Sequence, residues 1–427
     1  MKANDSITFT SKILVSMVAG IIVGVLINAL FIQNAFVNDF LVDGLFHVFG
    51  TVFIALLKMM VVPLVFVSLV CGVASLGDIA ALGRVGAKTI GLYLLTTAVA
   101  ITIALVLATA FGPGKGFELS GEVVEYQARE APAFTQVIID MIPANPFMAM
   151  AEGQMLQVIF FALMFGIALT LAGENGQRVL DIFTDLNEVI MKMVFMVIRV
   201  APIGVFCLLA KTFSLQGIYI LIPLLGYVIV VVIALLCHLL GTFTLLLRFI
   251  ARVNPITFIS KMRAPMAFAF STSSSGATIP ITLSAVETRL GVRNSVASFT
   301  VPLGATINMD GTAIMQGVAT VFIANVYGID LGISQFLTVI LTATLASIGT
   351  AAVPSAGLIM LTMVLSQVGL PIEGIALIFG IDRIIDMLRT AVNVAGDGTV
   401  TCVVARSEGA LDKTIFDEPK AGMIVKP

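Results

Sequence analysis

Apolar runs alternate with short polar connections along the first part of the chain. A helix that crosses a membrane needs about 20 mostly apolar residues. Runs of about that length or longer occupy 13–31, 44–74, 88–112, 154–173, 188–214 and 217–249. We predict one spanning helix for each run. The second and the sixth should tilt, because they exceed the thickness of the hydrocarbon core.

Two later regions, 255–291 and 334–370, have a helical pattern that small polar residues interrupt in the middle. The interruptions read Ser-Thr-Ser-Ser-Ser-Gly at 271–276 and Ser-Ile-Gly-Thr-Ala-Ala-Val-Pro-Ser-Ala-Gly at 347–357. The flanking halves are too short to cross a membrane alone. We therefore predict two re-entrant helical hairpins, whose irregular tips must be buried in protein or face a water-filled cavity.

Each predicted hairpin precedes a span with a polar centre. Residues 308–312 read Asn-Met-Asp-Gly-Thr, and residues 393–399 read Asn-Val-Ala-Gly-Asp-Gly-Thr. We interpret this as a weak internal repeat, in which a hairpin and then an unwound helix occur twice. Glycines that permit unwinding are Gly304, Gly311, Gly349, Gly357, Gly396 and Gly398. Interrupted segments in corresponding positions of two halves indicate the binding site of a transporter.

Five polar residues share one face of the last span: Asp382, Asp386, Arg389, Asn393 and Asp397. At 100° per residue they fall within about 80° of arc. A charged group at mid-membrane depth costs at least ~2.5–3.5 kcal/mol. We therefore expect this stripe to face a protein interior or a watery cavity and to bind a charged ligand.

The stripe favours a ligand that carries both a carboxylate and an amine. The fork of Arg389 matches a carboxylate, Asp386 could accept an ammonium, and Thr390 adds a hydroxyl. An acidic amino acid has these groups. The alternative is an internal ion pair between Arg389 and either Asp386 or Asp382.

Composition indicates a polytopic membrane protein. Hydrophobic residues make up 59% of the chain and charged residues 11%, and the mean hydropathy is +1.09; soluble domains carry about 25% charged residues. Basic residues gather at both termini and around 84–88 and 248–263, which predicts cytoplasmic termini. The histidines and cysteines show no metal or disulfide spacing, and no basic patch suggests nucleic acid.

Three motifs resemble the dicarboxylate/amino acid:cation symporter family: Ser-Ser-Ser-Gly at 273–276, Asn-Met-Asp-Gly-Thr at 308–312, and Asp-Met-Leu-Arg-Thr-Ala-Val-Asn-Val-Ala-Gly-Asp at 386–397. The family includes bacterial and archaeal aspartate/glutamate transporters and the vertebrate excitatory amino acid transporters. The resemblance covers essentially the whole chain. It implies an all-α membrane protein with eight transmembrane segments, two re-entrant hairpins and inverted repeats.

The resemblance also implies a homotrimer in a prokaryotic plasma membrane that takes up L-aspartate or L-glutamate with about three Na⁺. A mobile transport domain would move by an elevator mechanism, with the second hairpin as its gate. Residues 1–87 would be scaffold and 88–131 a transport-domain span with an external loop. Residues 132–249 would contain two scaffold spans and a transport-domain span, and 250–427 the transport core and cytoplasmic tail.

Site residues follow from the same resemblance. The substrate pocket would contain Thr272, Ser273, Ser274, Thr312, Val353, Gly357, Asp386, Arg389, Thr390 and Asn393. Arg389 would hold the side-chain carboxylate and Asp386 the amine, while Asn393 and the tip at Ser274 would hold the α-carboxylate. One Na⁺ site would use Gly304, Asn308, Asn393 and Asp397; a second, the carbonyls of Thr306, Ser347, Ile348 and Thr350; a third, Tyr93, Thr96, Thr97, Asn308 and Asp310.

The chain departs from the family at one feature. Archaeal members carry an arginine at the position of Thr272, and vertebrate members carry one at the position of Met387, whereas this chain has neither. Arg383 lies one helical turn before Met387 and could present its guanidinium near the same place. Unchanged transport by an Arg383→Ala variant would contradict this hypothesis.

Several alternatives stay open. Proton-coupled transport of C4-dicarboxylates would leave Asp386 without an amine, and transport of neutral amino acids would leave Arg389 without a carboxylate. Transport of an acidic amino acid with protons stays open, because a buried carboxylate can carry a proton.

We do not expect an enzyme. Ala-Gly-Asp at 395–397 lacks the Gly-x-Gly-Asp pattern of intramembrane aspartyl proteases, and no histidine is placed to serve Ser273–Ser275 as a base. An anion channel is a third class, and anion conductance would be a side activity.

Overall fold

The computed structural model describes residues 3–31, 34–74, 79–117, 139–348, 356–418 and 421. Within these ranges the regular structure is helical, apart from an isolated antiparallel bridge between Val292 and Leu411. The predicted all-α class is therefore confirmed. The longer helices are α1 (Ala3–Leu30), α2 (His47–Ala74), α3 (Ile79–Phe111), α6 (Met155–Leu171), α7 (Glu174–Arg199), α8 (Ala201–Gln216), α9 (Leu221–Cys237), α10 (Pro255–Thr272), α11 (Ser275–Thr288), α12 (Asn294–Ile307), α13 (Asp310–Val326), α14 (Ile333–Ser347), α15 (Ala356–Gln367) and α16 (Ile375–Ser407). Shorter elements are η1 (Val37–Phe46), α5 (Pro146–Glu152), η2 (Ile218–Ile220), η3 (His238–Phe243), η4 (Leu246–Ala251), η5 (Ile372–Gly374) and α17 (Lys413–Asp417).

Long apolar helices agree with a membrane protein. In the described part of the chain, three stretches are long and apolar enough to cross a membrane: Val37–Leu56, Arg84–Phe111 and Leu221–Ala251. The prediction of one helix over 188–214 is wrong, because α7 ends at Arg199 and α8 starts at Ala201. Pro202 lies in the first turn of α8, where proline starts a helix readily but cannot continue the preceding one.

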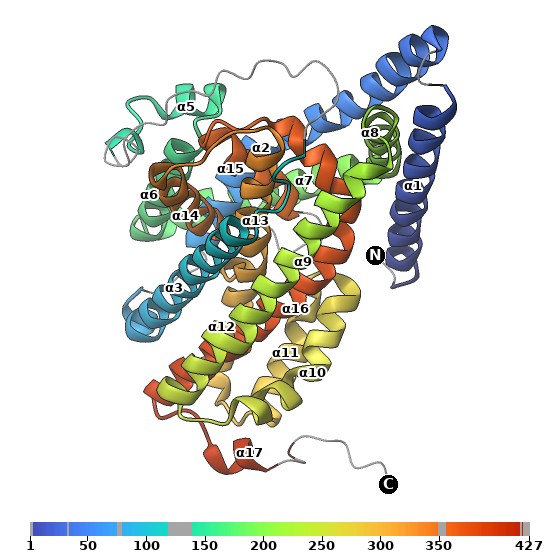
Figure 1. The fold of residues 1–427 in the computed structure, drawn as a ribbon. Coiled ribbons are helices and arrows are strands. Elements are labelled where there is room, and N and C mark those ends of the chain that lie inside the picture. The colour runs from blue at the N-terminus through green and yellow to red at the C-terminus, as the bar shows by residue number, and fades with distance from the viewer. Residues whose placement is uncertain are drawn as a thin grey trace.

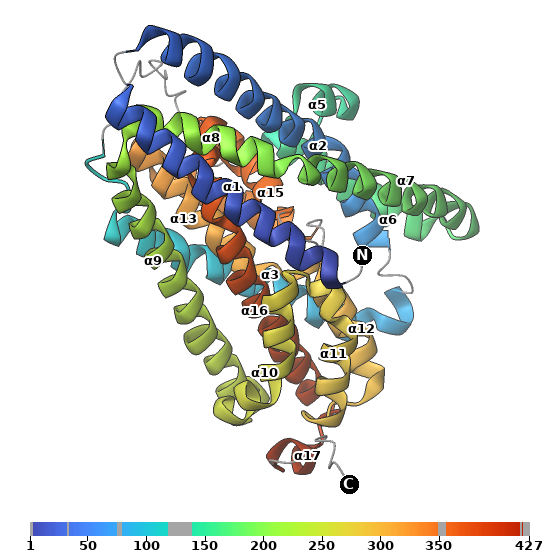
Figure 2. The same ribbon diagram turned by 90° about the vertical axis from the view of Figure 1, so that its right-hand side faces the viewer.

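The helices form two groups. Figure 2 shows α1, α2, α7 and α8 lying across one side of a bundle that contains α3, α9 to α13 and α16. In the first group, α8 packs along α1 and contacts α2. Gly24 permits the close approach of α1 and α8, because a Cβ at that position would lie 2.6 Å from the Ala210 carbonyl oxygen.

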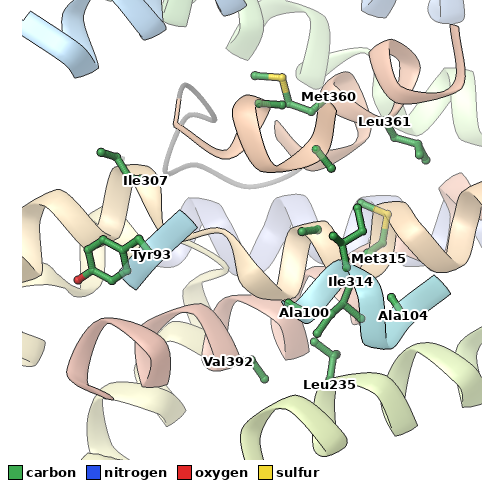
Figure 3. Close-up of a cluster of buried hydrophobic side chains, with 14 of the residues drawn as sticks. Tyr93, Ala100, Ala104, Leu235, Ile307, Ile314, Met315, Met360, Leu361 and Val392 are labelled. Atoms are coloured by element: carbon green, nitrogen blue, oxygen red, sulfur yellow. The ribbon is translucent and has the colours of Figure 1, made fainter. Parts of the chain in front are cut away.

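Helix α16 runs through the middle of the second group and contacts α9, α10, α12 and α13 (Figure 1). Beside it, α13 packs against α3. Figure 3 shows Ala100 and Ala104 of α3 close to Ile314 and Met315 of α13. Small residues let membrane helices approach closely. The central polar face of α16 is thereby enclosed by neighbouring helices.

Both interrupted regions of the sequence form pairs of helices. The first pair is α10 and α11, which pack against each other and meet at Ser273 in the left-handed conformation, with φ 51°. Ser274 caps α11 by accepting a hydrogen bond from the Ala277 N–H at 3.2 Å. The second pair is α14 and α15, which also contact each other. The predicted division of each region into two helices is confirmed.

The C-terminal segment docks onto the base of the α10–α11 pair, at the end of the bundle where α17 lies (Figure 1). Lys261 of α10 is buried, and its Nζ donates hydrogen bonds to the carbonyls of Arg289 at 2.7 Å, Ile415 at 2.8 Å and Phe416 at 2.8 Å. The Asp412 N–H donates to the Gly291 carbonyl at 2.8 Å. One ammonium thus joins the end of α11 to α17.

We expect Lys261→Met to lower the free energy of unfolding by about 3 kcal/mol, because three carbonyls lose a charged donor. The measurement is thermal and denaturant unfolding of the detergent-solubilised protein. Arg263→Met is the matched control, because Arg263 is an exposed basic residue on the same helix. Equal stability of the two variants would contradict the anchoring role.

A pair of basic residues on α3 holds the end of α16. Glu408 accepts hydrogen bonds from Lys88 at 2.6 Å and Arg84 at 2.5 Å, and these bonds lower the pKa of Glu408. A folded-state pKa below the unfolded value means that the interaction stabilises the fold above the ordinary glutamate pKa and is lost as the pH falls through the lowered pKa.

The pH dependence of this contact is testable. We expect wild type to melt slightly above Glu408→Gln at pH 7, because exposed ion pairs contribute little. The difference should shrink progressively below about pH 4.5. Melting curves of both proteins between pH 7 and about pH 3 give the measurement. A difference that grows on acidification would contradict the assignment.

Candidate functional site

The chain leaves the helical conformation between α12 and α13. Asn308 has φ −84° and ψ 91°, and α13 begins two residues later at Asp310. Helix ends leave carbonyl and N–H groups without intrahelical partners, so this break makes backbone oxygens available inside the bundle. The predicted interruption of this span is confirmed.

A first group of oxygen atoms lies where the break meets α16. Asn308 Nδ2 donates to the Asn393 carbonyl at 2.9 Å and to Asp397 Oδ1 at 2.8 Å. Asn308 Oδ1 is buried and has no hydrogen-bond partner. Gly304 lies against this group, because a Cβ there would be 2.5 Å from Asp397 Oδ1. The structure therefore brings together the four residues expected for one cation site.

A second group surrounds Asp310 at the start of α13. Asp310 Oδ1 accepts hydrogen bonds from Thr97 Oγ1 at 2.6 Å and Thr96 Oγ1 at 3.3 Å. The Tyr93 carbonyl accepts from both threonine hydroxyls, whereas the Tyr93 hydroxyl donates to the Thr300 carbonyl at 3.0 Å. All four of the residues expected here besides Asn308 are buried and adjacent.

His238 completes this second group, although its isolated position in the sequence gave it no expected role. Its Nε2 lies 2.9 Å from Asp310 Oδ2, and both side chains are fully buried. Its Nδ1 is buried and has no hydrogen-bond partner. An ionisable residue inside an apolar span is a functional candidate by default, and that signal could have identified His238.

The cation site expected from the carbonyls of Thr306, Ser347, Ile348 and Thr350 is described only in part. Ser347 ends α14 and Ile348 follows it, while Thr306 lies near the end of α12, where its hydroxyl donates to the Pro302 carbonyl at 2.9 Å. Thr350 lies outside the described residues, as does Val353 of the expected substrate pocket.

The tip between α10 and α11 presents the N-terminus of α11 to the bundle. Ser275 Oγ donates to the Ala305 carbonyl of α12 at 2.9 Å and ties the tip to that helix. Ser273 Oγ is buried and has no hydrogen-bond partner. The Thr272 hydroxyl instead donates back to its own helix. Free N–H groups at a helix N-terminus suit a carboxylate.

The charged stripe of α16 is buried along its whole length, as expected. Its members are Asp382, Asp386, Arg389, Asn393 and Asp397. Arg389 is only 2% exposed; its Nε donates to Asp386 Oδ1 at 2.9 Å, and its Nη1 donates to Asp382 Oδ1 at 3.1 Å. The internal ion pair that the sequence left open as an alternative is therefore present in the structure.

The backbones of two other helices lie directly against Arg389. A Cβ at Gly357 of α15 would be 2.9 Å from the guanidinium carbon, and a Cβ at Gly311 of α13 would be 2.5 Å from the Arg389 carbonyl oxygen. Thr312 is buried beside Gly311. The Thr390 hydroxyl donates to the Asp386 carbonyl at 2.6 Å, within its own helix.

Helix α16 is continuous, and the predicted unwinding at Gly396 and Gly398 is wrong. These glycines instead allow close contact between helices. A Cβ at Gly396 would lie 2.5 Å from Asn308 Nδ2, and one at Gly398 would lie 2.8 Å from Met262 Cε. The two halves of the apparent repeat therefore differ. The span after the first hairpin is broken between α12 and α13, whereas the span after the second hairpin, α16, is continuous.

Comparison with known proteins gives consistent matches over nearly the whole chain. The model of the sodium:dicarboxylate symporter family matches residues 9–407. The proton/glutamate-aspartate symporter of Escherichia coli is 36% identical over 421 residues, which cover 96% of this chain and 95% of that protein. The proton/sodium-glutamate symport protein of Bacillus caldotenax is 35% identical over 398 residues, covering 91% and 93%. Excitatory amino acid transporter 2 of Mus musculus is 33% identical over 406 residues, covering 82% and 71%.

Proposed function

Because this chain belongs to the sodium:dicarboxylate symporter family, we propose that it is a secondary active symporter that takes up L-aspartate or L-glutamate together with Na⁺. The observation that carries the proposal is the buried contact between Arg389 and Asp386. A guanidinium and a carboxylate side by side offer partners for both charged ends of an acidic amino acid.

Binding would proceed by exchange of ionic partners. A ligand carboxylate takes Arg389, and the ligand ammonium takes Asp386, so each buried ion loses one partner and gains another. A dicarboxylate provides no ammonium for Asp386, and a neutral amino acid provides no second anion for Arg389. A buried ion that is left without a partner costs about 3–5 kcal/mol. Binding therefore favours a ligand that carries both an ammonium for Asp386 and a side-chain carboxylate for Arg389.

Cation coupling is supported by the buried oxygen atoms that lie where the break between α12 and α13 meets α16. The unpartnered Oδ1 of Asn308, the Asp397 carboxylate and nearby carbonyls are the oxygen donors that hard cations prefer. Asn393 Oδ1 accepts from the Gly311 N–H at 2.7 Å, and Gly311 packs on the Arg389 backbone. A cation held by Asn308 and Asn393 would therefore fix the backbone that presents Arg389.

Uptake into proteoliposomes tests the function and its coupling ion. We expect radiolabelled L-aspartate to accumulate under an inward Na⁺ gradient. Excess unlabelled L-aspartate or L-glutamate should inhibit this uptake strongly, whereas succinate and serine should inhibit it far more weakly. Vesicles with K⁺ in place of Na⁺ are the control. Absence of saturable aspartate uptake under every gradient would contradict the proposal.

Proton coupling is the second candidate. It is supported by the contact between His238 and Asp310, two titratable groups that lie buried beside the cation-binding groups. The same vesicles, with an inward proton gradient and no Na⁺, distinguish the two candidates. Accumulation under the proton gradient alone would keep the substrate pocket and replace Na⁺ as the coupled ion.

We further propose a homotrimer in the plasma membrane, with cytoplasmic termini and an elevator movement gated by the α14–α15 hairpin. Residues 88–131 and 250–427, together with the span at 217–249, would form the moving domain. The packing of α2 and α8 against each other, of α1 against α8 and of α7 against α2, on one side of the bundle, supports this division. Light scattering of the detergent-solubilised protein should give a protein mass three times the chain mass of 45.1 kDa; the mass of one chain would contradict the trimer.

A further inference from the structure

Arg383 is a buried cation of α16 that the proposed binding scheme does not use. Its side chain is 6% exposed, whereas the adjacent Ile384 is 46% exposed. Its Nη1 lies 3.6 Å from Asp386 Oδ2, one helical turn along the same helix. This distance gives an ion pair without a direct hydrogen bond. Arg383 therefore acts on Asp386 mainly through its charge.

The two oxygens of Asp386 face different guanidinium groups. Oδ1 lies 2.8 Å from Arg389 Nη2 and 2.9 Å from Arg389 Nε, while Oδ2 faces Arg383. With Asp382, these residues form a buried cluster of two carboxylates and two guanidinium groups, and its formal charge is zero. If a ligand carboxylate draws Arg389 away, Arg383 stays beside Asp386.

We propose that Arg383 is a positioning residue for amine recognition. It holds Oδ2 of Asp386, so that Oδ1 is presented to the ligand ammonium when Arg389 turns to the ligand carboxylate. This inference rests on the proposed function, because it assumes an acidic amino acid at Arg389 and Asp386. It adds a specific consequence: removal of Arg383 weakens recognition of the amine more than recognition of the carboxylates.

The test compares ligands that differ in the amine. Inhibition constants of L-aspartate and of succinate, its analogue without the amine, are measured against radiolabelled L-aspartate in proteoliposomes. In the wild type, L-aspartate should inhibit far more strongly than succinate. In Arg383→Met, the ratio of the two constants should shrink about tenfold, as expected for the loss of one buried charge interaction. Arg383→Lys retains the charge and should recover part of the ratio.

The controls separate positioning from folding. Arg406→Met removes an exposed arginine from the last turn of the same helix and should keep the wild-type ratio. If Arg383 has only a structural role, Arg383→Met should weaken the binding of L-aspartate and succinate equally and leave the ratio of their inhibition constants unchanged. This result would overturn the inference and leave the proposed function intact. A wild-type protein that fails to bind aspartate would overturn the proposed function itself.

Discussion

Arg389→Lys should reduce kcat/KM for aspartate uptake by about a hundredfold or more. The guanidinium donates to Asp386 and Asp382 through separate nitrogens, and a lysine ammonium cannot reproduce this fork for the protein or for a ligand carboxylate. Disrupting a buried ion pair costs about 3–5 kcal/mol, and each 1.4 kcal/mol is about tenfold. Initial uptake rates at equal amounts of reconstituted protein give the measurement.

Arg406→Lys is the matched control for Arg389→Lys. It makes the same change in the same helix, at an exposed position in the last turn, and should transport like the wild type. Melting curves of both variants identify any loss of folded protein. Wild-type kcat/KM in a folded Arg389→Lys variant would show that Arg389 serves only the internal ion pair.

Asp310→Asn should have the second large effect, a fall in aspartate uptake of about a hundredfold with loss of its dependence on the coupled cation. The amide keeps the shape of the carboxylate, so the hydroxyls of Thr96 and Thr97 can still donate to its oxygen. The negative charge that attracts a cation is removed. Buried charges of this kind contribute several kcal/mol. The measurement is uptake rate as a function of cation concentration.

Asp330→Asn is the control for this second variant. Asp330 lies shortly after α13, is exposed, and belongs to none of the oxygen groups described above. Its uptake and cation dependence should match the wild type. Unchanged cation dependence in Asp310→Asn would remove Asp310 from the coupling mechanism and leave the Asn308–Asp397 group as the remaining candidate.

The residue types within a single segment were enough to predict the burial of the polar face of α16 and the interruption at 271–276. The polar stripe of α16 had to be buried because its charges cannot face lipid, and the structure buries every member. The small polar residues at 271–276 had to interrupt a helix because serine and glycine favour caps and turns. Ser273 and Ser274 now occupy the junction between α10 and α11.

Features that depend on a neighbouring segment could not be predicted in this way. Glycine permits either an unwound backbone or a close helix contact, and the sequence alone cannot choose between them at Gly396. The approach of Asn308 from another helix gives this glycine its packing role in the continuous α16. His238 could have been identified as an ionisable residue in an apolar span, but its partner Asp310, which is 72 residues away along the chain, could not.

The site residues also differ in whether one segment of the sequence was enough to identify them. Arg389 and Asp386 were identified because they lie one turn apart on one helix. The pairing of Asp310 with Thr96 and Thr97 came only from the family resemblance, because ordinary threonines in an apolar helix carry no signal of their own. The structure brings these three residues together across α3 and α13.

The central claim is that the Arg389–Asp386 pair and the buried oxygen groups act as one coupled unit. The most direct test is the dissociation constant of L-aspartate, measured by calorimetry on the purified protein over a range of Na⁺ concentrations at fixed ionic strength and pH. Coupling predicts that the affinity rises steeply with Na⁺, because ligands that share a conformation strengthen each other's binding. An aspartate affinity that is independent of Na⁺ would contradict the account.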